Sequence, residues 1–162
     1  MQSQAALTTQ RPLALFMLPP PLMFGVAFGI GALFQHFVPV PFVAGVASTY
    51  FAGIIILAAG VCLGLYLAAT FLMRRTTLNP FAEPSVFVAR GAYRFCRNPM
   101  YLSLITAYLG ATLMFGSAWS LVALLAPIAV LIRVVIPFEE ARMLATFGES
   151  YQAYCARVRR WL

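Results

Sequence analysis

"VAGVASTYFAGIIILAAGVCLGLYLAATFLM" occupies residues 43–73 and contains no charged side chain. A helix of about 20 apolar residues crosses the roughly 30 Å core of a bilayer. The stretch is longer than one straight span requires, so its first part, around residues 42–50, is expected to be tilted, interfacial or a loop. It therefore predicts a transmembrane helix that ends near residue 73.

The rest of the chain has the same apolar character. Hydrophobic residues make up 62% of it and charged residues 9%, and its mean hydropathy is +0.88, far outside the range of soluble domains. Further apolar stretches lie at about 13–35, 99–115 and 118–138. We predict an all-α integral membrane bundle of about four transmembrane helices with a helical C-terminal tail. Residues 1–162 then form one membrane domain, with a helical hairpin in 1–75 and the functional region in 76–162.

The arginines predict how the bundle is oriented. They precede the first apolar stretch, separate the second from the third and follow the fourth: Arg11, then Arg74, Arg75, Arg90, Arg94 and Arg97, then Arg142, Arg157, Arg159 and Arg160. The other two connections contain none. Short arginine-rich loops stay in the cytoplasm, so both termini and residues 74–98 are expected there. The net charge of +7 flanks apolar segments, which argues against a nucleic-acid partner.

Metal binding is not expected. Cys62, Cys96 and Cys155 have no metal-ligand spacing, and His36 is the chain's single histidine, so no ligand set is available. We expect three free thiols and no metal.

Two glycine pairs have the spacing that lets helix backbones approach closely. Gly25 precedes Gly29 by four residues, as Gly60 precedes Gly64, and GxxxG spacing is typical of contacts between membrane helices. Packing inside one bundle is the simpler interpretation. A homodimer through these faces is the alternative.

"RNPMY", residues 97–101, begins the third apolar stretch. Asn98 is a preferred N-cap residue and Pro99 falls at the first helical position, so a purely structural role explains both. The same helix start presents unpaired N–H groups and partial positive charge, which bind anions. Arg97 beside it could clamp a carboxylate. Both interpretations remain open.

Charged side chains near the end of the fourth stretch are the other candidates. Glu139 and Glu140 follow Pro137, and a helix would turn Glu140 inward and leave Glu139 more exposed. A cation inside an apolar helix is costly and predicts a partner or a function. Arg133 is close enough to the helix end to reach the membrane surface instead.

The tail after Glu140 is expected to form two short helices. Gly148 is a helix stop, and Tyr151, Tyr154 and Val158 would share one face of the second helix. A basic helix with aromatic anchors fits the membrane interface, so membrane lipids are expected partners.

"GAYRFCRNPMY" (91–101) followed by "FEEARMLATFGESYQAYCARVRRWL" (138–162) resembles the isoprenylcysteine carboxyl methyltransferase and phospholipid methyltransferase family, over about residues 76–162. The resemblance implies an integral membrane enzyme that transfers a methyl group from S-adenosylmethionine to a lipid-linked substrate. The small size and the style of the tail, compared with that family, indicate a bacterial inner membrane. The resemblance also implies a cytoplasmic cofactor pocket, contacted by Ser85, Val86, Phe87, Val88, Tyr93, Asn98, Pro99, Met100, Tyr101, Glu140 and, upstream, Asn79. Arg97 and Glu139, which flank these motifs, join the cofactor set.

Arg133 and Glu140 are the candidate catalytic residues. With a carboxylate acceptor no base is needed, and Arg133 would orient the substrate acid. With an ethanolamine nitrogen as acceptor, Glu139 or Glu140 would accept the proton.

The resemblance has two departures. The eukaryotic carboxyl methyltransferases have histidine in place of Asn98, and Ile136 stands where their substrate-contacting arginine lies. We favour O-methylation of a lipid-like or prenylated small substrate drawn from the bilayer. N-methylation of a phospholipid is an alternative, as are an NADPH-dependent membrane reductase and a non-catalytic membrane scaffold.

Overall fold

The computed structural model describes residues 18–41, 47–73, 87 and 89–162, and these form helices and short connections. The elements are α1 (Pro20–Phe37), α2 (Ala47–Met73), the 3-10 turn η2 (Gly91–Arg94), α3 (Pro99–Phe115), α4 (Ala118–Ala123), α5 (Leu125–Val130), the π-helical turn η3 (Leu131–Val135) and α6 (Ile136–Arg157). Three helical runs are long and apolar enough to cross a membrane: Pro20–Phe37, Ser48–Met73 and Ala118–Arg157. The apolar α3 has 17 residues, about 26 Å of helix. The predicted all-α membrane bundle is confirmed.

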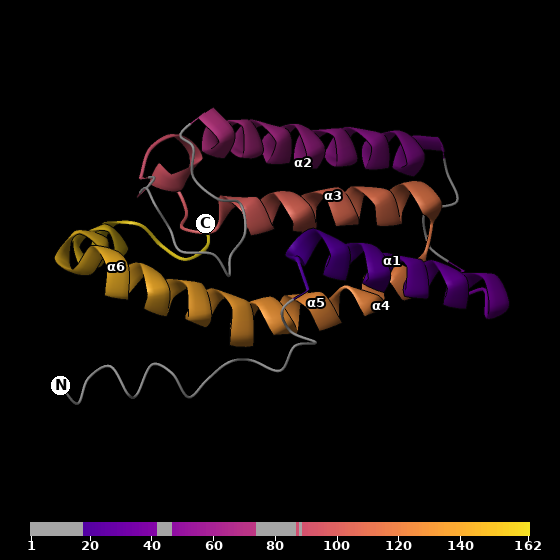
Figure 1. The fold of residues 1–162 in the computed structure, drawn as a ribbon. Helices are drawn as coiled ribbons and strands as arrows, with labels where there is room; N and C mark the ends of the chain where they lie inside the picture. The colour runs from indigo at the N-terminus through magenta and orange to yellow at the C-terminus, as the bar shows by residue number, and fades with distance from the viewer. Residues whose placement is uncertain (1–17, 42–46, 74–86, 88) are drawn as a thin grey trace.

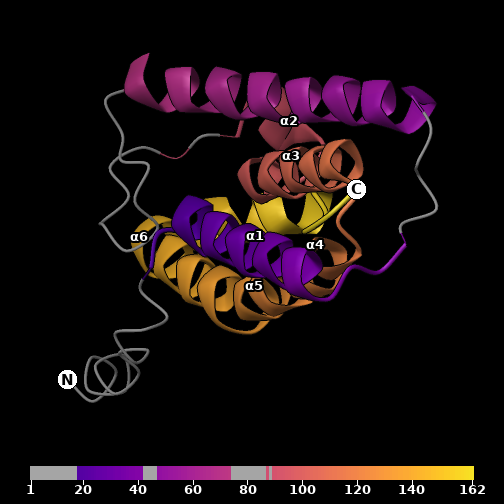
Figure 2. The same cartoon turned by 90° about the vertical axis from the view of Figure 1, so that its right-hand side faces the viewer.

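The helices run back and forth between two ends of the bundle (Figure 1). One end gathers the beginnings of α1 and α3, the end of α2, the turn η2, and α6 with the C-terminus. Seen from the side, α3 lies between α2 and a layer made of α1 with α4 to α6 (Figure 2). The two helices of residues 1–75 find their main partners in the other half of the chain, because α2 packs along α3 and α1 packs on α4.

Proline and glycine set the helix ends where the sequence predicts them. α1 begins at Pro20, and α3 begins at Pro99 and ends at Gly116, whose φ of 60° closes the helix in the left-handed conformation. α2 begins at Ala47, so part of the segment expected to be tilted or a loop belongs to the helix. The remainder, residues 42–46, lies outside the described residues, as do residues 13–17 of the first stretch.

Glycines hold α2 and α3 at close range. A Cβ atom at Gly60 would overlap the backbone of Ala107, and one at Gly110 would overlap the backbone of Leu57. The glycine face of α2 therefore packs against α3 inside the bundle. At Gly25 and Gly29 no atom of the residues that the structure describes lies near a would-be Cβ, so the expectation of a homodimer rests on that open face of α1.

The last crossing is a helical run interrupted at prolines and a glycine. Pro137 has no N–H to donate to the carbonyl of Arg133, and in the π-turn before it the N–H of Ile136 bonds the carbonyl of Leu131. Gly148 (φ 51°, ψ −125°) breaks α6 into two parts, as predicted. The chain reverses after this break, because residue 160 returns to contact residue 140.

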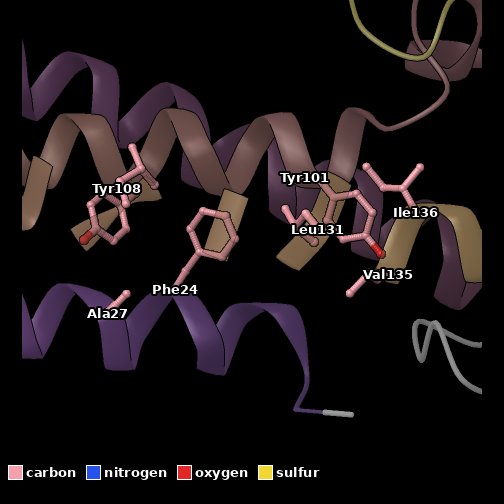
Figure 3. Close-up of a cluster of buried hydrophobic side chains, with 8 residues drawn as sticks. Phe24, Ala27, Tyr101, Tyr108, Leu131, Val135 and Ile136 are labelled. Carbon is pink, nitrogen blue, oxygen red and sulfur yellow. The ribbon is translucent and has the colours of Figure 1, made fainter. Parts of the chain in front are cut away.

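A hydrophobic core joins α1, α3 and the last crossing (Figure 3). Phe24 packs edge-on against Tyr108 with ring centroids 6.0 Å apart. Leu131 and Val135 are fully buried beside Tyr101. Tyr101 has its hydroxyl at the arginine-rich end of the bundle, where the polar residues begin.

Candidate functional site

The first polar contact at this end links α3 to α6. The hydroxyl of Tyr101 donates to Glu139 Oε1 over 2.7 Å. Tyr101 is buried and Glu139 is half-buried, so the bond lies largely out of water. Glu140 is also half-buried, and the expected difference in exposure between the two glutamates is not observed.

Glu140 is held by two arginines. Arg160 binds it with two parallel hydrogen bonds, Nε to Oε1 at 3.1 Å and Nη2 to Oε2 at 2.5 Å. Arg97 Nη1 lies 3.5 Å from Oε1 and also contacts Cys155 Sγ at 2.6 Å. A two-pronged contact of this kind fixes the orientation of a carboxylate as well as its position. Glu140 is therefore the electrostatic centre of the site.

The beginning of α3 is joined to the C-terminal segment, which we define as residues 158–162. Asn98 occupies the N-cap position, but its side chain makes no cap bond. Its Nδ2 donates instead to the carbonyl of Arg160 over 3.1 Å, and the Arg97 N–H donates to the carbonyl of Arg159 over 2.9 Å. The first turn of α3 is thus left without a side-chain cap, which keeps its N–H groups available to an anion.

A groove of about 290 Å³ opens beside these charges. Its walls are Arg97, Glu140, Ala141, Leu144, Tyr151, Gln152 and Cys155. The volume is near the lower end for small-molecule pockets, which begin at about 300 Å³. The groove combines one carboxylate, one guanidinium and an aromatic side chain, a set suited to a zwitterionic ligand with an apolar or aromatic part.

Burial and neighbouring charges shift the titration of groups around the site. Removal from water, and then the charge of Glu139, raise the pKa of Tyr93 above its ordinary value. Burial raises the pKa of the Cys96 thiol, so this thiol is less reactive than an exposed one. The hydrogen bonds to Glu140 raise the pKa of Arg160. Near neutral pH, Tyr93 and Cys96 are therefore uncharged and Arg160 keeps its positive charge.

Most of the predicted residues that the structure describes lie around this cluster. Tyr93 accepts a hydrogen bond from Tyr154 at its carbonyl, and Phe87 packs on Phe147 and Tyr154. Pro99 and Met100 form the first turn of α3 beside Arg97, Asn98 and Tyr101. Asn79, Ser85, Val86 and Val88 lie outside the described residues.

Arg133 stands apart from the cluster. Its side chain is exposed, and it makes no hydrogen bond or ion pair with any residue that the structure describes. It does not line the groove. Its predicted catalytic role stays a prediction that concerns the substrate and not the cofactor.

Six site residues were missed from the sequence. Ala141 and Leu144 line the groove beside Glu140 on α6. The other four reach the site only because the chain reverses at Gly148: Tyr151, Gln152, Cys155 and Arg160. The signal was present in the tail, where a glycine stop is followed by tyrosines at helical spacing. It predicted two helices, but not the direction in which the second one runs.

Tyr101→Phe is expected to destabilise the protein by about 1–3 kcal/mol, because it leaves the half-buried Glu139 carboxylate without its hydrogen-bond donor. Thermal unfolding in detergent measures the change. The matched control is Tyr50→Phe, since Tyr50 is exposed at the start of α2. Equal melting temperatures for the two variants would contradict a structural role for the Tyr101–Glu139 bond.

Fold and side-chain contacts together define an integral membrane protein with a cluster of charged residues beside a groove at one end of a helical bundle. Residues 48–150, more than half of the chain, match the phospholipid methyltransferase family. The chain therefore belongs to that family, and the resemblance predicted from its two motifs is confirmed.

Individual relatives add little to this assignment. A protein of Haemophilus influenzae, described only as uncharacterized, is 36% identical over 63 residues, which are 39% of this chain and 100% of that protein. No solved structure matches the chain. The family membership supports a membrane methyltransferase.

Proposed function

We propose that the protein transfers a methyl group from S-adenosylmethionine to a lipid-like substrate in the membrane. One observation supports this most directly: Arg97, which lies just before α3, and Glu140 of α6 line one groove at one end of the bundle. By the positive-inside rule this end faces the cytoplasm, where the methyl donor is dissolved.

The residues of the groove fit the methyl donor. Its amino-acid part has a carboxylate and an ammonium group, which need a cationic and an anionic partner. The buried Arg97 Nε has no hydrogen-bond partner among the described residues, and the first turn of α3 has no side-chain cap, so donors for a carboxylate remain. Glu140 can accept from the ammonium, and Tyr151 offers a ring to the adenosine part. When bound, S-adenosylmethionine supplies a methyl group activated on a sulfonium.

The chain's own residues would contribute by binding, alignment and exclusion of water. Aligning two reactants in a pocket removes much of the entropic barrier to their reaction. Arg97 and Glu140 would fix one end of the donor, so that its methyl group has one orientation. The apolar faces of the bundle would bring the acceptor from the bilayer.

A carboxylate is the acceptor that we favour. It is already a nucleophile at neutral pH and needs no base. Arg133 is an arginine on an apolar helix, exposed and without a partner among the described residues, so it is available to orient an acidic substrate.

A phospholipid amine is the second candidate, and a different contact favours it. An ethanolamine nitrogen must lose a proton, and Glu139 is a half-buried carboxylate held by Tyr101. A carboxylate removed from water is a better proton acceptor than an exposed one. The family description, phospholipid methyltransferase, points the same way.

Incubating the purified protein with methyl-labelled S-adenosylmethionine and a bacterial lipid extract tests the proposal. A labelled lipid whose label is released as methanol by mild base is a methyl ester and supports the carboxylate acceptor. Base-stable label on a phospholipid headgroup supports the amine. Absence of lipid label from protein that is folded and binds the donor would contradict a lipid-like acceptor.

A further inference from the structure

Glu140 already has a cationic partner supplied by the chain itself. Both of its carboxylate oxygens accept hydrogen bonds from the Arg160 guanidinium. Another cation that needs Glu140 therefore competes with Arg160 for the same two carboxylate oxygens. We propose that Arg160 is an internal competitor of the methyl donor, so that the C-terminal segment regulates cofactor binding at Glu140. This inference rests on the proposed function.

The backbone of the C-terminal segment is fastened independently of the Arg160 side chain. Its carbonyls at Arg159 and Arg160 accept hydrogen bonds from the Arg97 N–H and from Asn98 Nδ2. Trp161 packs against the hydrophobic core. Figure 1 shows the C-terminus returning from α6 to the beginning of α3. The guanidinium can therefore leave Glu140 without release of the segment.

The two arginines on Glu140 differ in how freely they can leave. The Arg160 side chain is 39% exposed and that of Arg97 is 18% exposed. Water can solvate a partly exposed guanidinium when it separates from its carboxylate, which lowers the cost of breaking the pair. Arg97 is additionally held by Cys155. Arg160 is thus the partner that exchanges, and Arg97 is the partner that stays.

Tethering makes the competition effective. A guanidinium that remains attached near Glu140 competes at a high local concentration, whatever the concentration of free ligand. The apparent affinity for the methyl donor falls in proportion to the fraction of molecules in which Glu140 is free of Arg160. A ligand without an ammonium group has no need of Glu140, and Arg160 should not affect it.

Calorimetric titration of the full-length protein in detergent with S-adenosylhomocysteine tests this inference, because the ligand keeps the ammonium group and does not react. Arg160→Gln should bind it about fivefold more tightly than the wild type, the range expected for release of one partly exposed ion pair. Arg157→Gln is the matched control. Arg157 is exposed, and its one side-chain hydrogen bond among the described residues is to the carbonyl of Ala153 on its own helix, so removal of this equal charge should leave the affinity unchanged.

Two further binding measurements distinguish competition at Glu140 from a general effect of charge. Methylthioadenosine lacks the amino-acid part, and its affinity should not respond to Arg160→Gln. In a Glu140→Gln background, Arg160→Gln should give no gain for S-adenosylhomocysteine. Thermal unfolding of each variant shows that the protein remains folded.

The outcomes distinguish this inference from the proposed function. Tighter binding of S-adenosylhomocysteine alone, dependent on Glu140, supports the competitor. Unchanged or weaker binding by a folded Arg160→Gln variant overturns it, as does an equal gain for methylthioadenosine, while cofactor binding by the wild type would leave the proposed function standing. If no folded variant binds S-adenosylhomocysteine, the proposed function falls and the inference falls with it.

Discussion

Glu140→Gln is expected to weaken binding of S-adenosylmethionine about 10- to 100-fold, because it removes the site's anionic partner for an ammonium group and a charged hydrogen bond contributes about 1.5–3 kcal/mol. The substitution also leaves Arg97 and Arg160 without the carboxylate that they share. Equilibrium binding of labelled cofactor to the purified variant measures the effect.

The matched control for this variant is Glu149→Gln. Glu149 is an exposed acid on the same helix, so its loss changes the net charge equally without touching the groove. The two variants should differ in affinity and agree in melting temperature to within a few degrees. Similar cofactor affinities for folded Glu140→Gln and Glu149→Gln would show that Glu140 does not bind the ammonium group of the cofactor.

Gly110→Leu is expected to prevent stable folding. A side chain at this position would overlap the backbone of Leu57 on α2, and backbone atoms cannot move aside as a side chain can. Overpacking commonly costs about 1–3 kcal/mol and more when a backbone must shift. Because α3 lies between α2 and the rest of the bundle (Figure 2), separation of the two helices should disrupt the whole protein. Yield of monodisperse protein and thermal unfolding in detergent measure the loss.

Gly25→Leu is the control that separates steric overlap from loss of a glycine. Nothing lies near a would-be Cβ of Gly25, so this variant should fold as well as the wild type. If Gly110→Leu unfolded at the same temperature as Gly25→Leu, the close approach of α2 and α3 would be contradicted.

The helices could be predicted from the sequence because strong local signals mark them. Pro99 and Gly116 bracket α3 at the positions that the apolar stretch suggests, and proline and glycine act through backbone sterics that need no partner. Gly148 acts in the same way and was predicted as a helix stop. The all-α class and the family followed from these features together with the two motifs.

The hydrogen bonds and ion pairs of the site could not be predicted, because they depend on a reversal of the chain. A positive φ at Gly148 permits a turn but does not determine where the following helix is directed. The ion pair of Arg160 with Glu140 joins residues that are 20 positions apart in the sequence. The reversal also brings the Arg160 carbonyl near Asn98, whose side chain donates to it and does not cap α3. Local propensity contains no information on such contacts.

Arg133 illustrates a second limit. Arg133 lies inside the π-turn, and the end of that turn separates it from Glu140. A π-turn holds more residues than an α-helical one and changes which face the preceding side chains occupy. Pro137 removes the α-helical hydrogen bond to the Arg133 carbonyl. The proline is evident in the sequence, but the π-turn that accompanies it could not be predicted from the sequence.

Binding of radiolabelled S-adenosylmethionine to the folded wild-type protein in detergent, with S-adenosylhomocysteine and NADPH as competitors, tests the central claim most directly. The groove lined by Arg97 and Glu140 predicts saturable binding that S-adenosylhomocysteine displaces and NADPH does not. Saturable binding that NADPH displaces, or none at all by folded protein, would contradict it.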